Sequence, residues 1–256
     1  MILVLDVGNT STTVGLYNGE ELVHHFRIPS DRDKTVKEFQ EELDVNLGSV
    51  NIEGAIIGSV VEEINDRLCY AIQYLYKVQP VLLSSTSNTG ITLSLKNNSE
   101  IGADRIANGF RAFELYKDAV IVVDFGTATT FDIVNKNGEF IGGIIAPGLT
   151  TQFASLNKST SKLPKLDVEY IEKAIGNCTY EAIMSGIVRG TACMIDGMLE
   201  QCEQELGQKA TIIATGGFCK IISKYMKRKF DVVSQNLTIE GLRDLYNINS
   251  LSLIHI

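Results

Sequence analysis

Short apolar runs alternate along the chain with longer segments in which apolar residues recur every three or four positions. The periodic segments predict amphipathic helices over residues 35–47, 60–77, 103–117 and 179–206. Apolar runs bounded by polar residues predict short buried strands over residues 54–60, 80–84 and 211–215. The polar stretch 155–165, which contains a proline, predicts a loop. Strands that alternate with helices are typical of α/β layers.

Two segments of the chain, residues 2–19 and 120–138, share one pattern. Each contains an apolar run, an Asp-x-Gly tripeptide that begins at Asp6 or Asp124, a hydroxyl-rich stretch and, further on, an Asn-Gly pair. Because Asn-Gly between strand-like segments is a strong hairpin signal, each copy is predicted to be a strand followed by a hairpin. The match is either a coincidence between two common strand-and-turn patterns or the mark of two related domains. The shared hairpin register and the 118-residue offset favour two domains.

Composition narrows the range of partners. The 256 residues include 23 Lys plus Arg and 31 Asp plus Glu, a net charge of −8, so the chain lacks the basic surface of a general nucleic-acid binder. It can still bind phosphate through backbone N–H groups, helix N-termini or a divalent cation. The five cysteines are scattered without a Cys-x-x-Cys, which predicts reduced thiols in a cytoplasmic protein. No run approaches 18 apolar residues and the N-terminus lacks basic residues, so we expect neither a membrane span nor a signal peptide.

The two Asp-x-Gly turns carry the first candidate chemistry. A glycine-containing turn after a buried strand presents backbone N–H groups and hydroxyls to a phosphate, and an aspartate at the strand end can hold a divalent cation that bridges phosphates. Taken singly, Asp6 or Asp124 is better explained as a turn-capping carboxylate. As a matched pair they favour a nucleotide clamped between two turns. The P-loop sequence Gly-x-x-x-x-Gly-Lys-Ser/Thr is absent, which excludes that class of kinase.

A third signal, EIGADR (residues 100–105), stands at the start of the predicted helix 103–117. Asp104 in a first helical turn is favoured by the helix dipole, so it is consistent with a simple helix start. The same position suits a general base, because the carboxylate projects from a rigid element. Arg105 beside it could hold an anionic substrate group with its planar guanidinium. The residues alone leave both interpretations open.

Together these motifs resemble the type III pantothenate kinases, a family of the actin–hexokinase–heat-shock ATPase superfamily. The resemblance covers essentially the whole chain and is carried by DVGNT (6–10), GADR (102–105), DFGT (124–127), GGIIAPG (142–148), TGG (215–217) and LTIEGL (237–242). It implies an α/β fold of two tandem ribonuclease-H-like (actin-like ATPase) domains, residues 1–117 and 118–256, with a cleft between them. It also implies ATP-dependent phosphorylation of pantothenate to 4'-phosphopantothenate, the first step of coenzyme A biosynthesis, by a cytoplasmic homodimer.

The resemblance also implies a role for each matching residue. Asp104 would be the general base, and Arg105 would hold the pantothenate carboxylate. Asp124 would help to hold a monovalent cation, K⁺ or NH₄⁺, and Asp6 would bind Mg²⁺ through phosphate or water. Thr179 would reach the substrate across the homodimer interface. The other residues implied for the pantothenate pocket are Gly102, Ala103 and Leu95. The residues implied around ATP are Asp6, Val7, Gly8, Asn9, Thr10, Ser11, Thr12, Thr13 and Thr127.

Two positions depart from the family pattern. Leu95 stands where the family often has tyrosine, and Asn98 follows Asn97 where the family usually has Asn-Pro. The missing tyrosine hydroxyl and ring predict a weaker or reshaped pantothenate contact rather than loss of the reaction, because Asp104 and Arg105 are present.

The last six residues, LSLIHI (251–256), form an abrupt apolar tail. They match the translation of the transposon end used in sequencing-library adapters, CTGTCTCTTATACACATC. We interpret them as a non-native tail, the alternative being a genuine terminal strand.

Two other functions stay open at this point. One is a kinase of the same superfamily that acts on another small molecule. The other is a non-catalytic, nucleotide-binding regulatory relative, which predicts nucleotide binding without turnover. The intact Asp6, Asp104 and Asp124 favour an enzyme, and the GADR motif favours pantothenate as its substrate.

Overall fold

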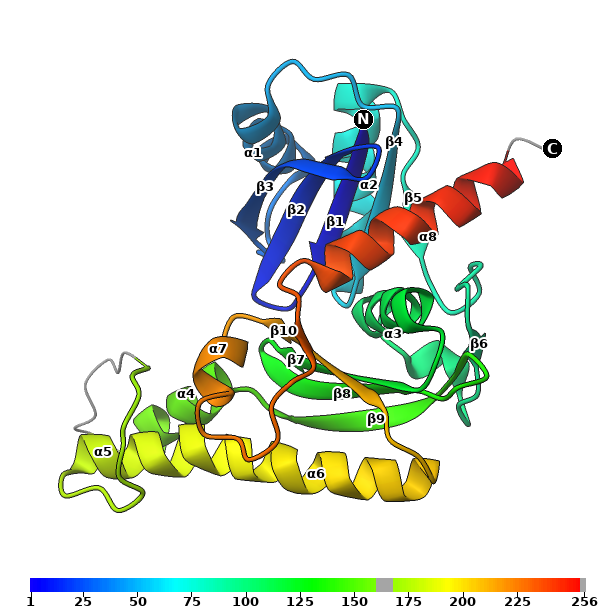
Figure 1. Cartoon of the computed structure of the whole chain (residues 1–256). Helices are drawn as coiled ribbons and strands as arrows, with labels where there is room; N and C mark the ends of the chain where they lie inside the picture. Colours follow the sequence, from blue (N-terminus) through cyan, green and yellow to red (C-terminus); the bar gives the residue numbers. More distant parts are fainter. Residues whose placement is uncertain (160–167, 254–256) are drawn as a thin grey trace. The chain divides into compact units, whose positions relative to one another are not determined.

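The computed structural model describes residues 1–159 and 168–253, which divide into two compact units (Figure 1). The first unit combines residues 1–114 with the C-terminal segment from Asn236, and the second comprises residues 115–235. The strands of the first unit are β1 (Ile2–Val7), β2 (Ser11–Asn18), β3 (Glu21–Pro29), β4 (Gly54–Ser59), β5 (Val81–Leu83) and β6 (Thr92–Leu93). Its helices are α1 (Val36–Leu47), α2 (Glu62–Tyr76), the 3₁₀ turn Asn98–Glu100, α3 (Ala103–Tyr116) and α8 (Leu237–Leu253).

The first unit is built on a sheet with the strand order β3-β2-β1-β4-β5. Strand β1 pairs with β2 in antiparallel and with β4 in parallel orientation. On one face, Leu3, Leu5 and Val7 of β1 are buried in a core with the apolar sides of α1 and α2. The other face is covered by α8, which contacts β1, β2, β4 and β5 (Figure 1).

The second unit repeats this topology. Its strands are β7 (Val120–Phe125), β8 (Ala128–Val134), β9 (Glu139–Pro147), β10 (Thr211–Gly216) and β11 (Val232–Val233). They lie in the order β11-β10-β7-β8-β9, which matches β5-β4-β1-β2-β3 strand for strand, with β7 antiparallel to β8 and parallel to β10. Both predicted Asn-Gly hairpins form, and Gly19 (φ +61°) and Gly138 (φ +76°) supply the left-handed backbone that these turns need. The internal repeat is therefore confirmed as a repeat of topology.

Helices of the second unit pack on one face of its sheet. They are α4 (Leu149–Ser159), α5 (Thr179–Met184), the π-helical segment Ser185–Arg189, α6 (Gly190–Leu206) and α7 (Cys219–Ile222). The segment predicted as one helix, 179–206, is continuous, and among the described residues it is the one helix long and apolar enough to cross a membrane. Its buried residues, including Val188, Ile195 and Leu199, join the core beneath β7, which identifies it as a core helix of this unit.

Glycines inside a helix either allow a neighbouring helix to pack closely or mark a break in the helix. A Cβ added at Gly186, Gly190 or Gly197 would meet no atom within 4 Å, so none of them lies at a close contact within this chain. The helix does not break either. At Ser185 it passes into the π-helical segment and then continues as α6.

The C-terminal helix α8 corrects the predicted domain division. The resemblance implies that all of residues 118–256 belong to the second domain, but α8 belongs to the first unit. The physical reason lies in β4, where two glycines leave room for side chains of α8. A Cβ at Gly54 would fall 1.8 Å from the Tyr246 hydroxyl, and one at Gly58 would fall 2.7 Å from Leu242. The sheet face is therefore shaped for a helix from the far end of the sequence.

The predicted loop over residues 155–165 is wrong at its start. Helix α4 continues to Ser159, because Leu149 and Phe153, one turn apart, are buried and anchor a helix whose other positions are mostly polar. Residues 160–165 lie outside the described residues. The other predicted helices and strands of both units form, with ends within about two residues of those expected.

Candidate active site

The first Asp-x-Gly turn joins β1 to β2. The Gly8 N–H donates to the Ser11 carbonyl at 3.2 Å, which closes a tight turn with Asn9 and Thr10 exposed at its tip. Asp6 lies at the end of β1 and pairs in register with Thr13. This turn presents backbone groups, hydroxyls and one carboxylate together at the end of a buried strand, as an anion site requires.

Not every residue of this turn can reach a ligand with its side chain. The side chain of Val7 is buried in the core against α1 and α2. Thr12 is also fully buried, and its hydroxyl is hydrogen-bonded to that of Ser30 at 2.8 Å. The structure therefore gives these two residues a structural role, and leaves the polar side chains at the tip and the partly exposed Ser11 and Thr13 for contact with a ligand.

A neighbouring loop, which the sequence analysis missed, contacts the same turn. The guanidinium of Arg32, in the loop after β3, donates to Asn9 Oδ1 at 3.2 Å and forms an exposed ion pair with Glu63 at 3.5 Å. Arg67 of α2 holds this loop by donating to the carbonyls of Arg32 and Lys34 at 2.7 and 2.6 Å. Sequence periodicity contains no signal for such contacts, since they join a loop, a turn and a helix.

Asp104 lies in the first turn of α3. Its Oδ1 accepts a hydrogen bond from the Arg105 backbone N–H at 2.8 Å. A Cβ at Gly102 would lie 2.4 Å from this Oδ1, so only glycine leaves room for the carboxylate to fold back over the start of the helix. Burial raises the pKa of the Asp104 carboxyl, against the opposing effects of the Arg105 N–H and the Arg105 charge. A carboxylate with a raised pKa is a stronger base than an exposed one.

The Asp6 turn and the Asp104 segment meet at one edge of the first sheet. Asp6 pairs in parallel register with Gly58 of β4, and a Cβ at Gly58 would lie 3.5 Å from the Cβ of Ala103. One residue pair further on, the Val60 N–H donates to the Val7 carbonyl at 3.0 Å. Because the carboxyl ends of parallel strands share an edge, the end of β1 and the start of α3 are held together there by β4.

The segment before α3 shows what the departures from the family pattern do. Asn98 accepts from the Leu95 N–H at 3.2 Å and donates to the Leu93 carbonyl at 3.1 Å, so it ties this loop into a turn. Asn97 accepts from the Ser99 N–H and hydroxyl at 3.2 and 2.8 Å. Asparagine at position 98 thus replaces the rigidity of a proline with two hydrogen bonds. Leu95 is half-buried within the turn.

The second Asp-x-Gly turn, between β7 and β8, is closed in the same way. The Gly126 N–H donates to the Ala128 carbonyl at 3.0 Å, and Thr127 is exposed at the tip. The Thr127 carbonyl accepts from the Gly148 N–H at 3.0 Å and from the Thr151 hydroxyl at 2.7 Å. The GGIIAPG motif therefore supports this turn through its last glycine.

The TGG motif (215–217) lies beside Asp124. Thr215 pairs in parallel register with Asp124. A Cβ at Gly216 (φ +86°) would fall 2.8 Å from Asp124 Oδ1 and 2.6 Å from the Phe125 carbonyl oxygen. Glycine is required here both by the left-handed backbone and by the close approach of these oxygens. Thr179, the remaining predicted substrate residue, is exposed at the first position of α5 in the second unit.

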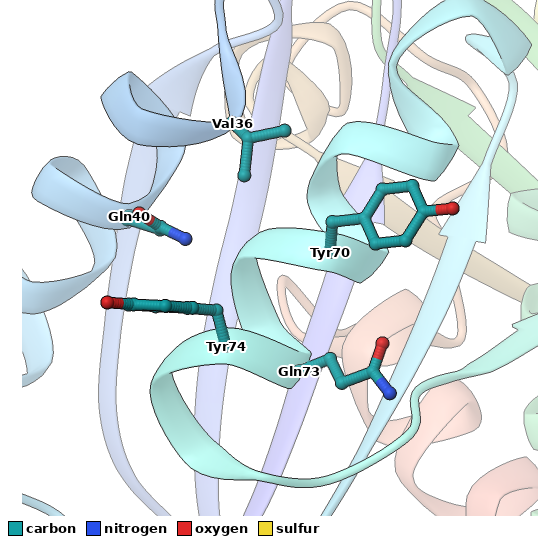
Figure 2. A pocket seen from close by; sticks show the side chains of 5 residues that line it. All are labelled: Val36, Gln40, Tyr70, Gln73 and Tyr74. Atoms are coloured by element: carbon teal, nitrogen blue, oxygen red, sulfur yellow. The ribbon is translucent and has the colours of Figure 1, made fainter.

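A shallow pocket lies elsewhere on the first unit, between α1 and α2 (Figure 2). Its lining is uncharged: Val36, Gln40, Tyr70, Gln73 and Tyr74. Helices α1 and α2 cover the core face of the sheet, whereas Asp6 faces the opposite side, so this pocket is separate from the Asp6 and Asp104 site. Within the described residues, no three His, Cys, Asp or Glu side chains cluster as a metal site, which leaves Asp6 and Asp124 as single carboxylates.

Known proteins with similar sequences share one activity. The family model for type III pantothenate kinase matches residues 2–201. The type III pantothenate kinase of Syntrophus aciditrophicus (strain SB) is 38% identical over 255 residues, covering 98% of this chain and 100% of that protein. That of Exiguobacterium sp. (strain ATCC BAA-1283 / AT1b) is 37% identical over 254 residues, covering 97% of this chain and 99% of the relative.

Solved structures with similar folds include actin-like ATPases. A Baf family protein from Campylobacter jejuni matches with a TM-score of 0.63 and 18% identity, covering 97% of this chain and 99% of the other. MreB 5 of Spiroplasma citri, solved with AMPPNP bound, matches with a TM-score of 0.57 and 12% identity, covering 99% and 98%. At these identities the likeness concerns the fold alone, and it confirms the predicted pair of ribonuclease-H-like domains.

Proposed function

The chain belongs to the type III pantothenate kinases, and from this premise we propose which of its own residues carry the reaction. The enzyme is a transferase that moves a phosphoryl group from ATP to pantothenate in coenzyme A biosynthesis. As a kinase of the actin-like ATPase superfamily it uses ATP with a divalent cation. Our proposal adds the general base, the phosphate and substrate contacts, the identity of the cations, and the dimer.

Asp104 is the general base that accepts the proton of the attacking pantothenate hydroxyl. The observation that carries this role is its position: a partly buried carboxylate in the first turn of α3, at the same sheet edge as the Asp6 phosphate turn. Fixing the carboxylate on a helix start holds it in one place, which is what positioning for phosphoryl transfer requires. The raised pKa that burial gives this carboxyl increases its strength as a base.

The test of Asp104 is ADP release from ATP and Mg²⁺ with pantothenate present or omitted. Asp104→Asn keeps the shape and the hydrogen bond from the Arg105 N–H but cannot take the proton, so kcat should fall by about 10²–10⁴-fold. ATP binding, measured by calorimetry, should be unchanged. A variant with normal kcat would remove Asp104 from the reaction.

ATP is bound by the two Asp-x-Gly turns. In the first unit the phosphates contact the backbone N–H groups of the 8–13 segment and the hydroxyls of Thr10, Ser11 and Thr13, and Asp6 holds Mg²⁺ through phosphate or water. In the second unit Thr127 contacts the phosphates. The support is the exposed, tightly closed tip of each turn and the single carboxylate at each strand end. Mg²⁺ neutralises charge on the transferring phosphoryl group, while the protein orients it.

Pantothenate binds beside Asp104. Arg105 holds the substrate carboxylate with its guanidinium, and Gly102, Ala103 and Leu95 line the same pocket. Arg105→Ala should raise the KM for pantothenate strongly and leave the KM for ATP unchanged. Leu95→Tyr should lower the KM for pantothenate, because it supplies an aromatic wall and a hydroxyl. An unchanged pantothenate KM in Arg105→Ala would contradict this placement.

Asp124 helps to hold a monovalent cation, K⁺ or NH₄⁺. The carboxylate lies at the end of β7, where Gly216 permits the close approach of oxygen atoms, and oxygen donors suit a hard cation. Turnover should be high in potassium or ammonium salts and low in sodium salts at equal ionic strength. Asp124→Asn should weaken the response to K⁺, and equal rates of the wild type in all three salts would contradict the site.

We also propose a cytoplasmic homodimer in which Thr179 of one subunit completes the pantothenate site of the other. All five cysteines are free, which supports a reducing compartment. Mixed dimers test the shared site, because a dimer of Asp104→Asn and Thr179→Ala subunits contains one site with both residues intact only if the site is shared. Co-purified mixtures should recover activity that neither parent has. Mixtures no more active than their parents would place Thr179 and Asp104 in sites within one subunit.

A further inference from the structure

Four residues in register form a row across the first sheet. Arg27 of β3 pairs with Thr13 of β2, Thr13 pairs with Asp6 of β1, and Asp6 pairs with Gly58 of β4. Because paired residues project from the same face of a sheet, all four lie on the face opposite α1 and α2. Arg27 is therefore about 10 Å from Asp6, two strand spacings away on the same face.

Arg27 is exposed and, among the residues that the structure describes, forms no ion pair or hydrogen bond. Other arginines on this side of the sheet are already engaged. Arg111 donates to Glu240 and Asp244 at 3.3 and 2.9 Å. Arg243 donates to the Glu20 carbonyl at 2.9 Å and also pairs with Asp244. Arg27 is thus a cation left available next to the phosphate turn.

The internal repeat shows that the fold does not need a cation at this position. In the second unit the corresponding row runs from Asp124 to Thr130 and on to Ile145. Ile145 is 66% exposed, so the same place in the same topology accepts an uncharged side chain facing solvent. Building the strand therefore does not account for the arginine.

We propose that Arg27 binds the phosphate groups of the nucleoside triphosphate held at the β1–β2 turn. This inference rests on the proposed ATP site of the first unit. The turn segment 6–13 contains no lysine or arginine, so its own contacts with phosphate are neutral donors. A guanidinium two strands away supplies the fixed positive charge, and its planar set of donors matches phosphate oxygens.

Calorimetry with Arg27→Gln tests the contact. Loss of a charged hydrogen bond should weaken ATP binding about 10- to 100-fold, while adenosine, which has no phosphate, should bind as to the wild type. In the steady state the KM for ATP should rise by a similar factor and the KM for pantothenate should stay constant. Arg27→Lys should recover part of the ATP affinity, because it keeps the charge but not the planar donor set.

The matched control is Lys37→Gln, which removes one exposed positive charge from α1 of the same unit. It should leave ATP binding unchanged, and the melting temperatures of all variants should match the wild type. ATP affinity and KM at wild-type values in Arg27→Gln would overturn the inference, as would an equal loss of adenosine binding. If the wild type binds ATP but releases no ADP with pantothenate, the proposed function fails, and the calorimetry still decides the role of Arg27.

Discussion

Replacing Gly241 by alanine tests the contact that joins the C-terminal helix to the helix carrying Asp104. Gly241 lies in α8, and a Cβ there would fall 2.3 Å from the Ala107 carbonyl oxygen and 2.9 Å from its carbon. Both atoms belong to the backbone of α3, so no side chain can rotate away, and the helices must move apart.

The expected size of the effect follows from two opposing terms. In an unobstructed helix, alanine in place of glycine stabilises by about 1 kcal/mol. Overpacking of a close contact costs about 1–3 kcal/mol, and a clash with backbone belongs at the upper end. The net loss is therefore about 2 kcal/mol, which corresponds to a fall in Tm of roughly 4–8 °C for a chain of this size.

Activity should fall as well, because Ala107 lies less than one turn after Asp104 on α3. A shift of α3 displaces the carboxylate, so kcat should decrease while ATP binding at the β1–β2 turn is less affected. Differential scanning calorimetry and ADP release measure the two effects. Asn247→Ala, an exposed position of the same helix, is the control and should keep or slightly raise the Tm. A Gly241→Ala protein as stable as the wild type would refute the packing argument.

Three further predictions concern charge and the chain end. Burial alone would raise the pKa of Glu203, but hydrogen bonds from Arg228, Lys209 and the Ala210 N–H lower it to about 2. Folding stability on the order of 3 kcal/mol should therefore be lost as pH falls from about 4.5 to 2. Acid titrations of the Glu203→Gln variant should lack this loss. Because burial raises the pKa of Asp104, its ionisation opposes folding at neutral pH, and Asp104→Asn should raise the Tm at pH 7. For the same reason, the acid limb of the wild-type kcat/KM profile should lie above the usual aspartate pKa of about 4. Deleting residues 251–256 should leave Tm and turnover unchanged, and a loss of either would show that the tail is native.

The fold was predictable from the sequence where the signal is local. Two Asn-Gly turns at nearly equal distances from Asp6 and Asp124 indicated the repeat, and the five strands of each repeat lie in the same order. The return of α8 to the first unit was not predictable from periodicity, because no local pattern says which sheet a helix covers. The sequence reflects that contact in Gly54 and Gly58, two glycines on one face of a buried strand.

The residues of the candidate site were also predictable only in part. The family motifs indicated Asp104 and Arg105, and the position of Gly102 against the Asp104 carboxylate gives a steric reason for the motif. Arg27 carried no motif. Its place beside the phosphate turn depends on the register between three strands, which pairwise hydrogen bonds set and which the sequence shows only as alternation along β3.

Because α8 completes the first unit, the structure also implies the order in which the two units fold during synthesis. The second unit is contiguous in sequence, so it can fold as soon as residue 235 has left the ribosome. The first unit begins at residue 1 but lacks a cover for one face of its sheet until the last twenty or so residues emerge. Nascent chains that stall after the second unit would thus carry the Asp6 turn and α3 without the helix that packs against both β1 and Ala107, and the N-terminal unit would be the last to mature.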